Sequence, residues 1–502
     1  MSDEPADERR LVATGIPGLD DILGGGVSPD RVYLVEGNPG SGKTTLALHY
    51  LFEGCRLGQK GLYVTLSETK VELHDVARSH GWSLDGVGLL ELVAPESELE
   101  PDNQYSMFQP SEVELGETTR AILSEIERTK PTRVVIDSLS EMRLLAQSPL
   151  RYRRQILALK QFFIGRECTV LLLDDLTSET EDLQLQSIAH GVLTLEQLSP
   201  GYGAERRRLR VTKLRGQSYR GGYHDFMIRR GGLEVYPRLV ASEHKRAGQR
   251  GLLKSGNAQL DALMGGGLPF GTSTVLLGPA GTGKSTTALL YARSVASRGD
   301  RAVVFTFDER LETILERTAG LGMDIAGDIE AGLVEIHTVD AAELSPGEFA
   351  HRVREAAAGD GAPGAKVVVI DSLNGYLHAM PEERFLIAQL HELLTYLGHK
   401  GVVTFLIVAQ HGLVGSMQTP IDTTYLADTV VLFRFFEAMG QVRQAVSVLK
   451  KRSGKHERTI RELRLGAGGV MLGEPLSDFQ GVLMGTPTFR GTDASLLRSP
   501  DG

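Results

Sequence analysis

Two short stretches of the sequence combine glycines, a lysine and a hydroxyl residue at a spacing suited to holding phosphate. Residues 37–44 read GNPGSGKT and residues 278–285 read GPAGTGKS, so both match GxxxxGK[ST]. Glycines let backbone N–H groups turn toward a phosphate, and a following helix adds the positive end of its dipole. The lysine neutralises phosphate oxygens and the hydroxyl binds Mg²⁺. Each stretch follows an apolar run and opens a helical pattern, which indicates two sites for ATP and Mg²⁺.

The nucleotide contacts expected from these two loops cover nine consecutive positions each. In the first loop they are Gly37, Asn38, Pro39, Gly40, Ser41, Gly42, Lys43, Thr44 and Thr45. In the second loop they are Gly278, Pro279, Ala280, Gly281, Thr282, Gly283, Lys284, Ser285 and Thr286. Among them, Thr44 and Ser285 are the expected Mg²⁺ ligands.

Acidic residues close two apolar runs downstream of the loops. VVID ends at Asp137 and VVVID ends at Asp371, and each follows its loop at the distance expected of a second Mg²⁺-binding element. A carboxylate there would hold the hydration shell of the ion. Neither aspartate is followed by glutamate, so a general base for water must come from another part of the chain.

The candidates for that base are Glu68 in the first half and the pair Asp308 and Glu309 in the second. They end the apolar runs 62–66 and 302–307, next to the strands that lead into the phosphate-binding loops. A carboxylate in that place can orient and deprotonate an attacking water.

The chain repeats itself once. Residues 11–44 resemble residues 252–285, and Lys43 and Lys284 differ by 241 positions. The same offset pairs VTLSE at 64–68 with FTFDE at 305–309, so a whole domain is duplicated.

Each half alternates apolar runs with helical stretches, which predicts an α/β fold in which each half is a mostly parallel twisted sheet flanked by helices. Together with the two phosphate-binding loops, this pattern resembles two tandem RecA-like P-loop domains. The expected strands are 31–35, 62–66, 133–136 and 169–173 in the first half, and 273–277, 302–307, 366–370 and 402–408 in the second. Hairpins are expected at 191–198 with 206–214 and at 429–435 with 443–450. The expected domains are 11–238 and 252–488, joined by a linker at 239–251, with disordered ends at 1–10 and 489–502.

Composition narrows the class of protein. The 502 residues carry a formal net charge of −10, which disfavours a nucleic-acid partner. No apolar run is long enough to span a bilayer, and the N-terminus MSDEPADERR is not a secretory signal. Only two cysteines occur, Cys55 and Cys168, far apart, so a reducing cytoplasm and no membrane association are expected.

Beyond the loops, the chain resembles the KaiC family of double-domain RecA-like ATPases, known from the circadian oscillator. The resemblance rests on TGIPGLDDILGGG and SGNAQLDALMGGG at the domain starts, ERRRLRVTKLRGQSYRGGYHDFMI at 205–228, VSVLKKRSGKHERTIREL at 446–463, and GTPT at 485–488. It implies a homohexameric ring with ATP at each subunit interface. By position, Lys213 and Arg215 in the first half, and Lys450 and Arg452 in the second, would reach the neighbouring subunit's γ-phosphate.

The chain departs from the family's Glu-Glu pair at the catalytic strand ends. It has Ser67-Glu68 in the first half and Asp308-Glu309 in the second. Ser67 cannot act as a base, so turnover in the first domain depends on Glu68 or is impaired, which suggests a domain used mainly for ATP-dependent assembly. Asp308 keeps the charge on a shorter side chain.

The resemblance also implies serine/threonine autokinase activity in the second domain. Counting back from Asp428-Thr429 places Thr424 and Tyr425 at the phosphoacceptor positions. Tyr425 has a different reach, so an ordered two-site cycle is not expected. The short tail after Thr488 favours a KaiC-like signalling ATPase over a complete oscillator.

Two other functions remain open from the sequence. A DNA-dependent RecA-like motor would need basic loops toward the ring centre, and residues 412–427 contain no Lys or Arg. A nucleotide-dependent assembly platform with little hydrolysis would fit Ser67 in the first half.

Overall fold

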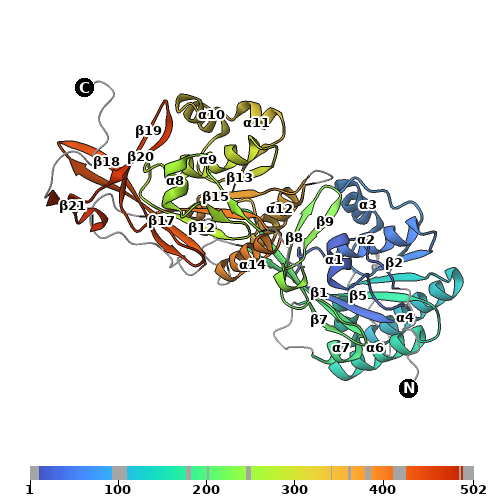
Figure 1. The fold of residues 1–502 in the computed structure, drawn as a ribbon. Helices are drawn as coiled ribbons and strands as arrows, with labels where there is room; N and C mark the ends of the chain where they lie inside the picture. The colour runs from blue at the N-terminus through green and yellow to red at the C-terminus, as the bar shows by residue number, and fades with distance from the viewer. Residues whose placement is uncertain are drawn as a thin grey trace, which may run out of the picture. The chain divides into compact units, whose positions relative to one another are not determined.

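The structure is a computed structural model that describes residues 11–92, 110–176, 183–199, 203–244, 250–340, 342–359, 363–378, 386–410, 426–484 and 488–489. It divides into two compact units, Met1–Arg238 and Leu239–Gly502 (Figure 1). Each unit contains one large twisted sheet with helices against it (Figure 1).

The first unit has a nine-stranded sheet with the order β3-β2-β4-β5-β1-β6-β7-β8-β9. Its strands are β1 (Val32–Gly37), β2 (Gly61–Thr65), β3 (Val87–Glu91), β4 (Arg133–Asp137), β5 (Thr169–Asp175), β6 (Gly191–Leu198), β7 (Arg206–Leu214), β8 (His224–Arg229) and β9 (Gly232–Tyr236). The strands from β3 to β6 pair in parallel, and β6 to β9 form an antiparallel extension.

Helices cover both faces of this sheet. They are α1 (Pro17–Ile22), α2 (Lys43–Arg56), α3 (Lys70–Ser79), α4 (Pro110–Thr129), α5 (Leu139–Ala146), α6 (Pro149–Phe163) and α7 (Leu183–Ile188). Side chains alternate across β1, so Tyr33 and Val35 enter a core with α1, α2 and α3, whereas Val32 and Leu34 enter a core with α4, α5 and α6. Because such a strand is covered by helices on both faces, none of its side chains faces solvent, which explains the continuous apolar runs of the sequence.

The second unit repeats this plan in the order β14-β13-β15-β16-β12-β17-β18-β19-β20. Its large-sheet strands are β12 (Ser273–Gly278), β13 (Ala302–Thr306), β14 (Val334–Thr338), β15 (Val367–Asp371), β16 (Val403–Ala409), β17 (Thr429–Ala438), β18 (Gln441–Lys451), β19 (Arg461–Gly466) and β20 (Gly469–Pro475). Two small pairs join β10 (Leu252–Leu253) to β11 (Leu268–Pro269) and β21 (Phe479–Gln480) to β22 (Thr488–Phe489).

Helices again lie against both faces of the second sheet, which has a separate apolar cluster on each side. They are α8 (Ala258–Leu263), α9 (Lys284–Ala296), α10 (Leu311–Gly320), α11 (Ala326–Glu330), α12 (Pro346–Ala358), α13 (Leu373–His378) and α14 (Leu386–His399), with short 3₁₀ turns η3 (Ala241–Glu243) and η4 (Val482–Met484).

The observed sheets confirm the predicted fold class, and every strand and hairpin expected from the sequence lies within two residues of an observed one, apart from extensions at the hairpin ends. The start of the expected linker behaves differently. Leu239 and Ala241 are buried in the core of the second unit, and the Ala241 N–H donates to Glu392 Oε2 at 2.9 Å. Residues 239–244 therefore belong to the packed second unit, because their apolar side chains find a surface there.

Strand register brings the candidate chemistry of the first unit to one edge. Thr65 pairs with Asp137 and Gly37 pairs with Asp175, so β2 ends with β4 and β1 ends with β5, two residues further along the same edge. The strand before Glu68 was expected beside the strand that leads into the loop, but β4 and β5 lie between β2 and β1. Ligands of open α/β sheets bind at this carboxyl edge. None of the helices in the described ranges combines the length and hydropathy needed to cross a bilayer.

A buried arginine ties the first unit together. Arg133, at the start of β4, is 1% exposed and donates to Gln59 Oε1 at 2.7 Å, Ala13 O at 2.8 Å and Tyr50 O at 2.7 Å. Its guanidinium also lies over the Tyr50 ring, 4.7 Å from the centroid. Burial lowers the pKa of Arg133, while the nearby Tyr50 and Glu53 act in the opposite direction.

We expect Arg133→Ala to destabilise the first unit by about 3 kcal/mol, because two buried carbonyls lose their donor and a cavity remains. Thermal unfolding followed by near-UV circular dichroism measures the loss. Arg78→Ala is the control, since that side chain is 78% exposed. Equal melting of the two variants would contradict this role of Arg133.

Candidate functional site

The first phosphate-binding loop connects β1 to α2. Gly42 occupies the N-cap of α2 with φ of 99°, a left-handed conformation that residues with a Cβ rarely adopt. Gly283 holds the same place before α9 with φ of 95°. Both loops therefore end on a helix N-terminus with exposed backbone donors, the geometry that binds an anion.

Lys43 lies buried beneath the first loop. Its Nζ donates to Gly37 O at 2.8 Å and Asn38 O at 3.0 Å, and forms an ion pair with Asp175 Oδ1 at 2.7 Å. Asp175 ends β5, directly opposite Gly37 in the sheet. The first site thus places a carboxylate against the lysine expected to bind phosphate.

Asp137 and Thr44, the expected Mg²⁺-binding pair, lie side by side. Thr44 Oγ1 donates to Asp137 Oδ2 at 3.3 Å, and Tyr63 OH donates to the same oxygen at 2.5 Å. Burial raises the pKa of Asp137, while the bonds from Tyr63 and Thr44 and the charge of Lys43 act in the opposite direction. Tyr63 holds one carboxylate oxygen from within the sheet, because β2 and β4 are neighbours.

Glu68 follows β2 in a tight turn. Thr65 Oγ1 donates to Glu68 O at 2.6 Å and accepts from the Glu68 N–H at 3.0 Å, and Thr69 then caps α3 with Glu72 in a capping box. Glu68 Oε2 is buried and has no hydrogen-bond partner among the residues that the structure describes. Burial, followed by the negative charges of Asp137, Glu72 and Asp175, raises the pKa of Glu68.

The second phosphate-binding loop borders a cavity of about 280 Å³. Its lining residues come from the loop, the strand ends and β19: Ala280, Gly281, Gly283, Lys284, Ser285, Thr286, Asp308, Arg317, Asp371, Ser372, Ile407, Ala409 and Leu465. Lys284 Nζ donates to Pro279 O at 2.6 Å, and burial lowers the pKa of Lys284 to about 8. At the position opposite Gly278, β16 carries Ala409 where the first site carries Asp175.

Asp371 occupies the second site as Asp137 occupies the first. Burial raises the pKa of Asp371, and its hydrogen bond with Ser285 and the charges of Arg317 and Lys284 oppose that rise. The expected ligands Ser285 and Asp371 are thus in contact, as Thr44 and Asp137 are.

Asp308 and Glu309 differ in their partners. Ser372 Oγ donates to Asp308 Oδ2 at 2.7 Å. Glu309 forms an ion pair with Arg317 of α10, whose Nη2 lies 2.7 Å from Glu309 Oε2. Burial raises the pKa of Glu309, whereas Arg317 acts to lower it.

The four cations expected to act across an interface lie away from their own loops. Lys213 pairs with Val192 near the start of β6, and its Nζ donates to Ala189 O at 2.8 Å, whereas the loop follows the far end of β1. Arg215 donates to Ser187 O at 3.1 Å.

In the second unit, Lys450 Nζ donates to Ala427 O at 3.0 Å and Arg452 lies 3.4 Å from Asp428. Lys450 pairs with Val430 at the start of β17. In both units the structure keeps these cations apart from the phosphate-binding loop of the same unit.

Three neighbours of the sites escaped the sequence analysis: Tyr63, Asp175 and Arg317. Asp174-Asp175 at the end of an apolar run was a usable signal, since strand ends carry the other carboxylates. Tyr63 and Arg317 were visible only as mismatches of the repeat, where Val304 and Val76 stand. Thr424 and Tyr425 lie outside the described residues.

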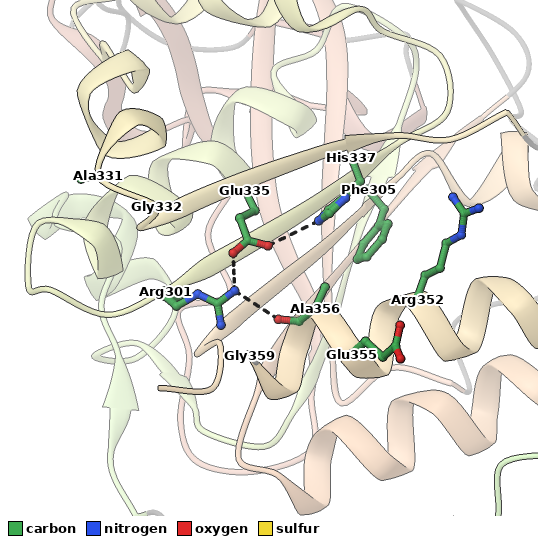
Figure 2. A pocket seen from close by; sticks show the side chains of 10 residues that line it. All are labelled: Arg301, Phe305, Ala331, Gly332, Glu335, His337, Arg352, Glu355, Ala356 and Gly359. Atoms are coloured by element: carbon green, nitrogen blue, oxygen red, sulfur yellow. Dashed lines mark hydrogen bonds and ion pairs between the residues drawn. The ribbon is translucent and has the colours of Figure 1, made fainter. Parts of the chain in front are cut away.

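A second, larger hollow of about 700 Å³ lies on the second unit, and Figure 2 shows its lining side chains. Arg301 bonds to Glu335, and His337 Nε2 lies 3.5 Å from Glu335 Oε2. Arg301 and Gly332 precede β13 and β14, so this hollow lies toward the amino ends of the strands. Its lining carries two arginines and two glutamates, so it has no excess of positive charge to attract phosphate.

Comparison with known proteins places these sites in context. A family model described as "ATPase: KaiC" matches residues 12–240 and 253–477. The circadian clock oscillator protein KaiC of Thermosynechococcus vestitus is 26% identical over 496 residues, which cover 97% of this chain and 93% of the relative. The circadian clock protein KaiC3 of Synechocystis is 25% identical over 513 residues, with 97% of each chain covered.

The ion pair of Lys43 with Asp175 gives a prediction about affinity. Asp175→Ala removes a carboxylate that competes with phosphate for the lysine, so we expect ATP to bind the first site about fivefold more tightly, roughly 1 kcal/mol. Titration with a fluorescent ATP analogue in a Lys284→Ala background measures it. In a Lys43→Ala background, Ala409→Asp should weaken ATP binding at the second site by a similar factor. Weaker ATP binding by Asp175→Ala would contradict the competition.

Proposed function

Because the chain belongs to the KaiC family of ATPases, we propose that it is a ring-forming ATPase with unequal sites, which hydrolyses ATP in the first domain and phosphorylates itself in the second. The observation that carries this proposal is the duplicated arrangement of lysine, hydroxyl and aspartate beneath two phosphate-binding loops, with different carboxylates beside each. Its biological role would be signalling or clock-like regulation.

Both sites suit ATP with Mg²⁺. The described ranges hold no group of three or more His, Cys, Asp or Glu side chains placed to bind a metal alone. An ion would therefore be held by Thr44 and Asp137, or by Ser285 and Asp371, together with phosphate oxygens. When bound, Mg²⁺ would neutralise charge on the β- and γ-phosphates.

In the first domain, Glu68 is the candidate general base. Its buried, unpartnered Oε2 and raised pKa suit a group that accepts a proton from water. Lys43 would move from Asp175 to the phosphate, a short exchange of one anion for another. We infer that Ser67 does not prevent turnover, since Glu68 alone supplies the carboxylate.

In the second domain, Asp308 lines the cavity beside the loop, and Glu309 is held near it by its ion pair with Arg317. A protein hydroxyl is bulkier than water and must be brought in line with the γ-phosphate. Thr424 is the proposed acceptor, with Tyr425 a less suitable one because of its longer reach.

Assembly would complete both sites. Lys213, Arg215, Lys450 and Arg452 are separated from the loops of their own units, which supports a role on the loop of a neighbouring copy. A cation supplied in this way stabilises charge in the transition state and couples chemistry to ring formation. The proposed assembly is a homohexamer.

Glu68→Gln tests the division of labour. We expect it to lower total phosphate release by more than tenfold, because a positioned base contributes about a hundredfold at its site. Because the pKa of Glu68 is raised, this carboxylate is protonated at a higher pH than an exposed glutamate. When the pH is lowered, first-site hydrolysis should therefore begin to fall at a higher pH than it would with an exposed glutamate as the base. Malachite-green assays measure the rates, with the exposed Glu127→Gln as control. If Glu309→Gln alone abolishes release, the assignment of hydrolysis to the first domain is wrong.

Autophosphorylation is tested by mass spectrometry of the full chain after incubation with ATP and Mg²⁺. We expect one phosphate on Thr424, absent from Thr424→Val and from Asp308→Asn. The ATPase rate of Thr424→Val should stay within about twofold of the parent, since water is the acceptor in the other domain. Phosphate at other positions, at the same level in Thr424→Val, would refute Thr424 as acceptor.

A further inference from the structure

Arg317 links three parts of the second site. It lies on α10, and its Nη2 is 2.7 Å from Glu309 Oε2. Its Nη1 donates to Thr286 Oγ1 at 3.3 Å, in the first turn of α9 directly after the phosphate-binding loop. Arg317 also lines the cavity that contains Lys284 and Asp371. The guanidinium therefore fixes the Glu309 carboxylate against the helix that follows the loop.

The first site has no counterpart to this arginine. Helix α3 spans Lys70–Ser79 and α10 spans Leu311–Gly320, the same ten positions of the repeat, and Val76 stands where Arg317 does. Glu68 occupies the place of Glu309, and each is bracketed by the threonine three residues before it. The turn is thus the same in both units, whereas Glu68 Oε2 is buried with no partner in the described ranges and Glu309 Oε2 is paired.

An ion pair at this position changes what a carboxylate can do. A guanidinium bond occupies a lone pair that a water molecule needs, and the positive charge weakens the carboxylate as a base. The side chains of Glu309 and Arg317 are 25% and 28% exposed, so solvent only partly screens the pair. The neighbouring Asp308 is bonded to Ser372 and not to a cation among the described residues.

We propose that Arg317 is a positioning residue that sets the acceptor specificity of the second site, by tying Glu309 away from water and leaving Asp308 to serve a protein hydroxyl. This inference rests on the proposed function. The specificity of the two sites would then follow from a single difference between α3 and α10.

The two reactions differ only in the acceptor. At the first site, Glu68 takes a proton from water as the water oxygen bonds to the γ-phosphorus. The bond from that phosphorus to the β,γ-bridging oxygen breaks, and ADP leaves with the electron pair, giving inorganic phosphate. At the second site, Asp308 takes the proton of a Ser or Thr hydroxyl, the same bridging bond breaks, and the products are ADP and a phosphoester.

The test measures phosphate release in a Glu68→Gln background, where the second site supplies the remaining hydrolysis. We expect Arg317→Val to raise kcat for that release about tenfold, as one pKa unit of base strength allows, with KM changed by less than about twofold. Arg317→Lys should return the rate to that of the parent. If Arg317 had only a structural role, Arg317→Val would not raise kcat, and Arg317→Lys would not restore the parental rate.

The reciprocal variant transplants the arginine. In a Glu309→Gln background, Val76→Arg should lower first-site release about tenfold, because Glu68 then acquires the same partner. Thermal melting within a few degrees of the parent confirms folding for each variant.

The inference alone is overturned if Arg317→Val, in the Glu68→Gln background, leaves phosphate release unchanged or lowers it. This conclusion requires that the double variant Glu68→Gln with Glu309→Gln is inactive. If that double variant still hydrolyses ATP at the parental rate, the proposed function fails, and the role of Arg317 fails with it. The two failures are therefore distinguished by the double variant.

Discussion

Buried negative charge at the carboxyl edge of each parallel sheet is the constraint on which both sites depend. Asp137 is buried and Asp371 is half-buried at the cavity wall, and each is kept beside a lysine and a hydroxyl that offset the cost of burial. The sheet enforces this proximity, because β1, β2, β4 and β5 end at the same edge and a phosphate-binding loop follows the central strand. A metal cation held at such a site would supply the missing positive charge, and that charge would in turn attract a polyphosphate.

The two copies of the fold solve this problem with different side chains. In the first, Asp175 pairs with Lys43 and Tyr63 holds Asp137. In the second, Ala409 stands opposite the loop strand, and Arg317 compensates Glu309. The backbone follows the same plan in both copies, so the proposed difference in chemistry would come from charge. Within the described part of the chain, Glu68 Oε2 has no hydrogen-bond partner, whereas Glu309 is paired with Arg317 and Asp308 lines the cavity.

Much of this was predictable from sequence because periodicity and loop spacing are local properties. Apolar runs located the strands, and GxxxxGK[ST] located Lys43 and Lys284 beneath their loops. Pairings between distant segments were not predictable, since no spacing brings Tyr63 to Asp137 or Asp175 to Lys43. Arg317 looked like an ordinary helical arginine until the turn before α10 placed Glu309 within its reach. The packing of Leu239 and Ala241 was also not visible in the sequence, because they bury against a helix more than a hundred residues away along the chain. The predicted phosphoacceptors lie outside the described residues.

The central claim is that the two sites send the γ-phosphoryl group to different acceptors. Single-turnover reactions with γ-³²P-labelled ATP test it most directly, when Lys43→Ala and Lys284→Ala are compared for label in protein and in free phosphate. The account predicts that Lys43→Ala keeps the labelled protein and loses most of the free phosphate, and that Lys284→Ala shows the reverse. The same ratio of protein-bound to free label in both variants would contradict it.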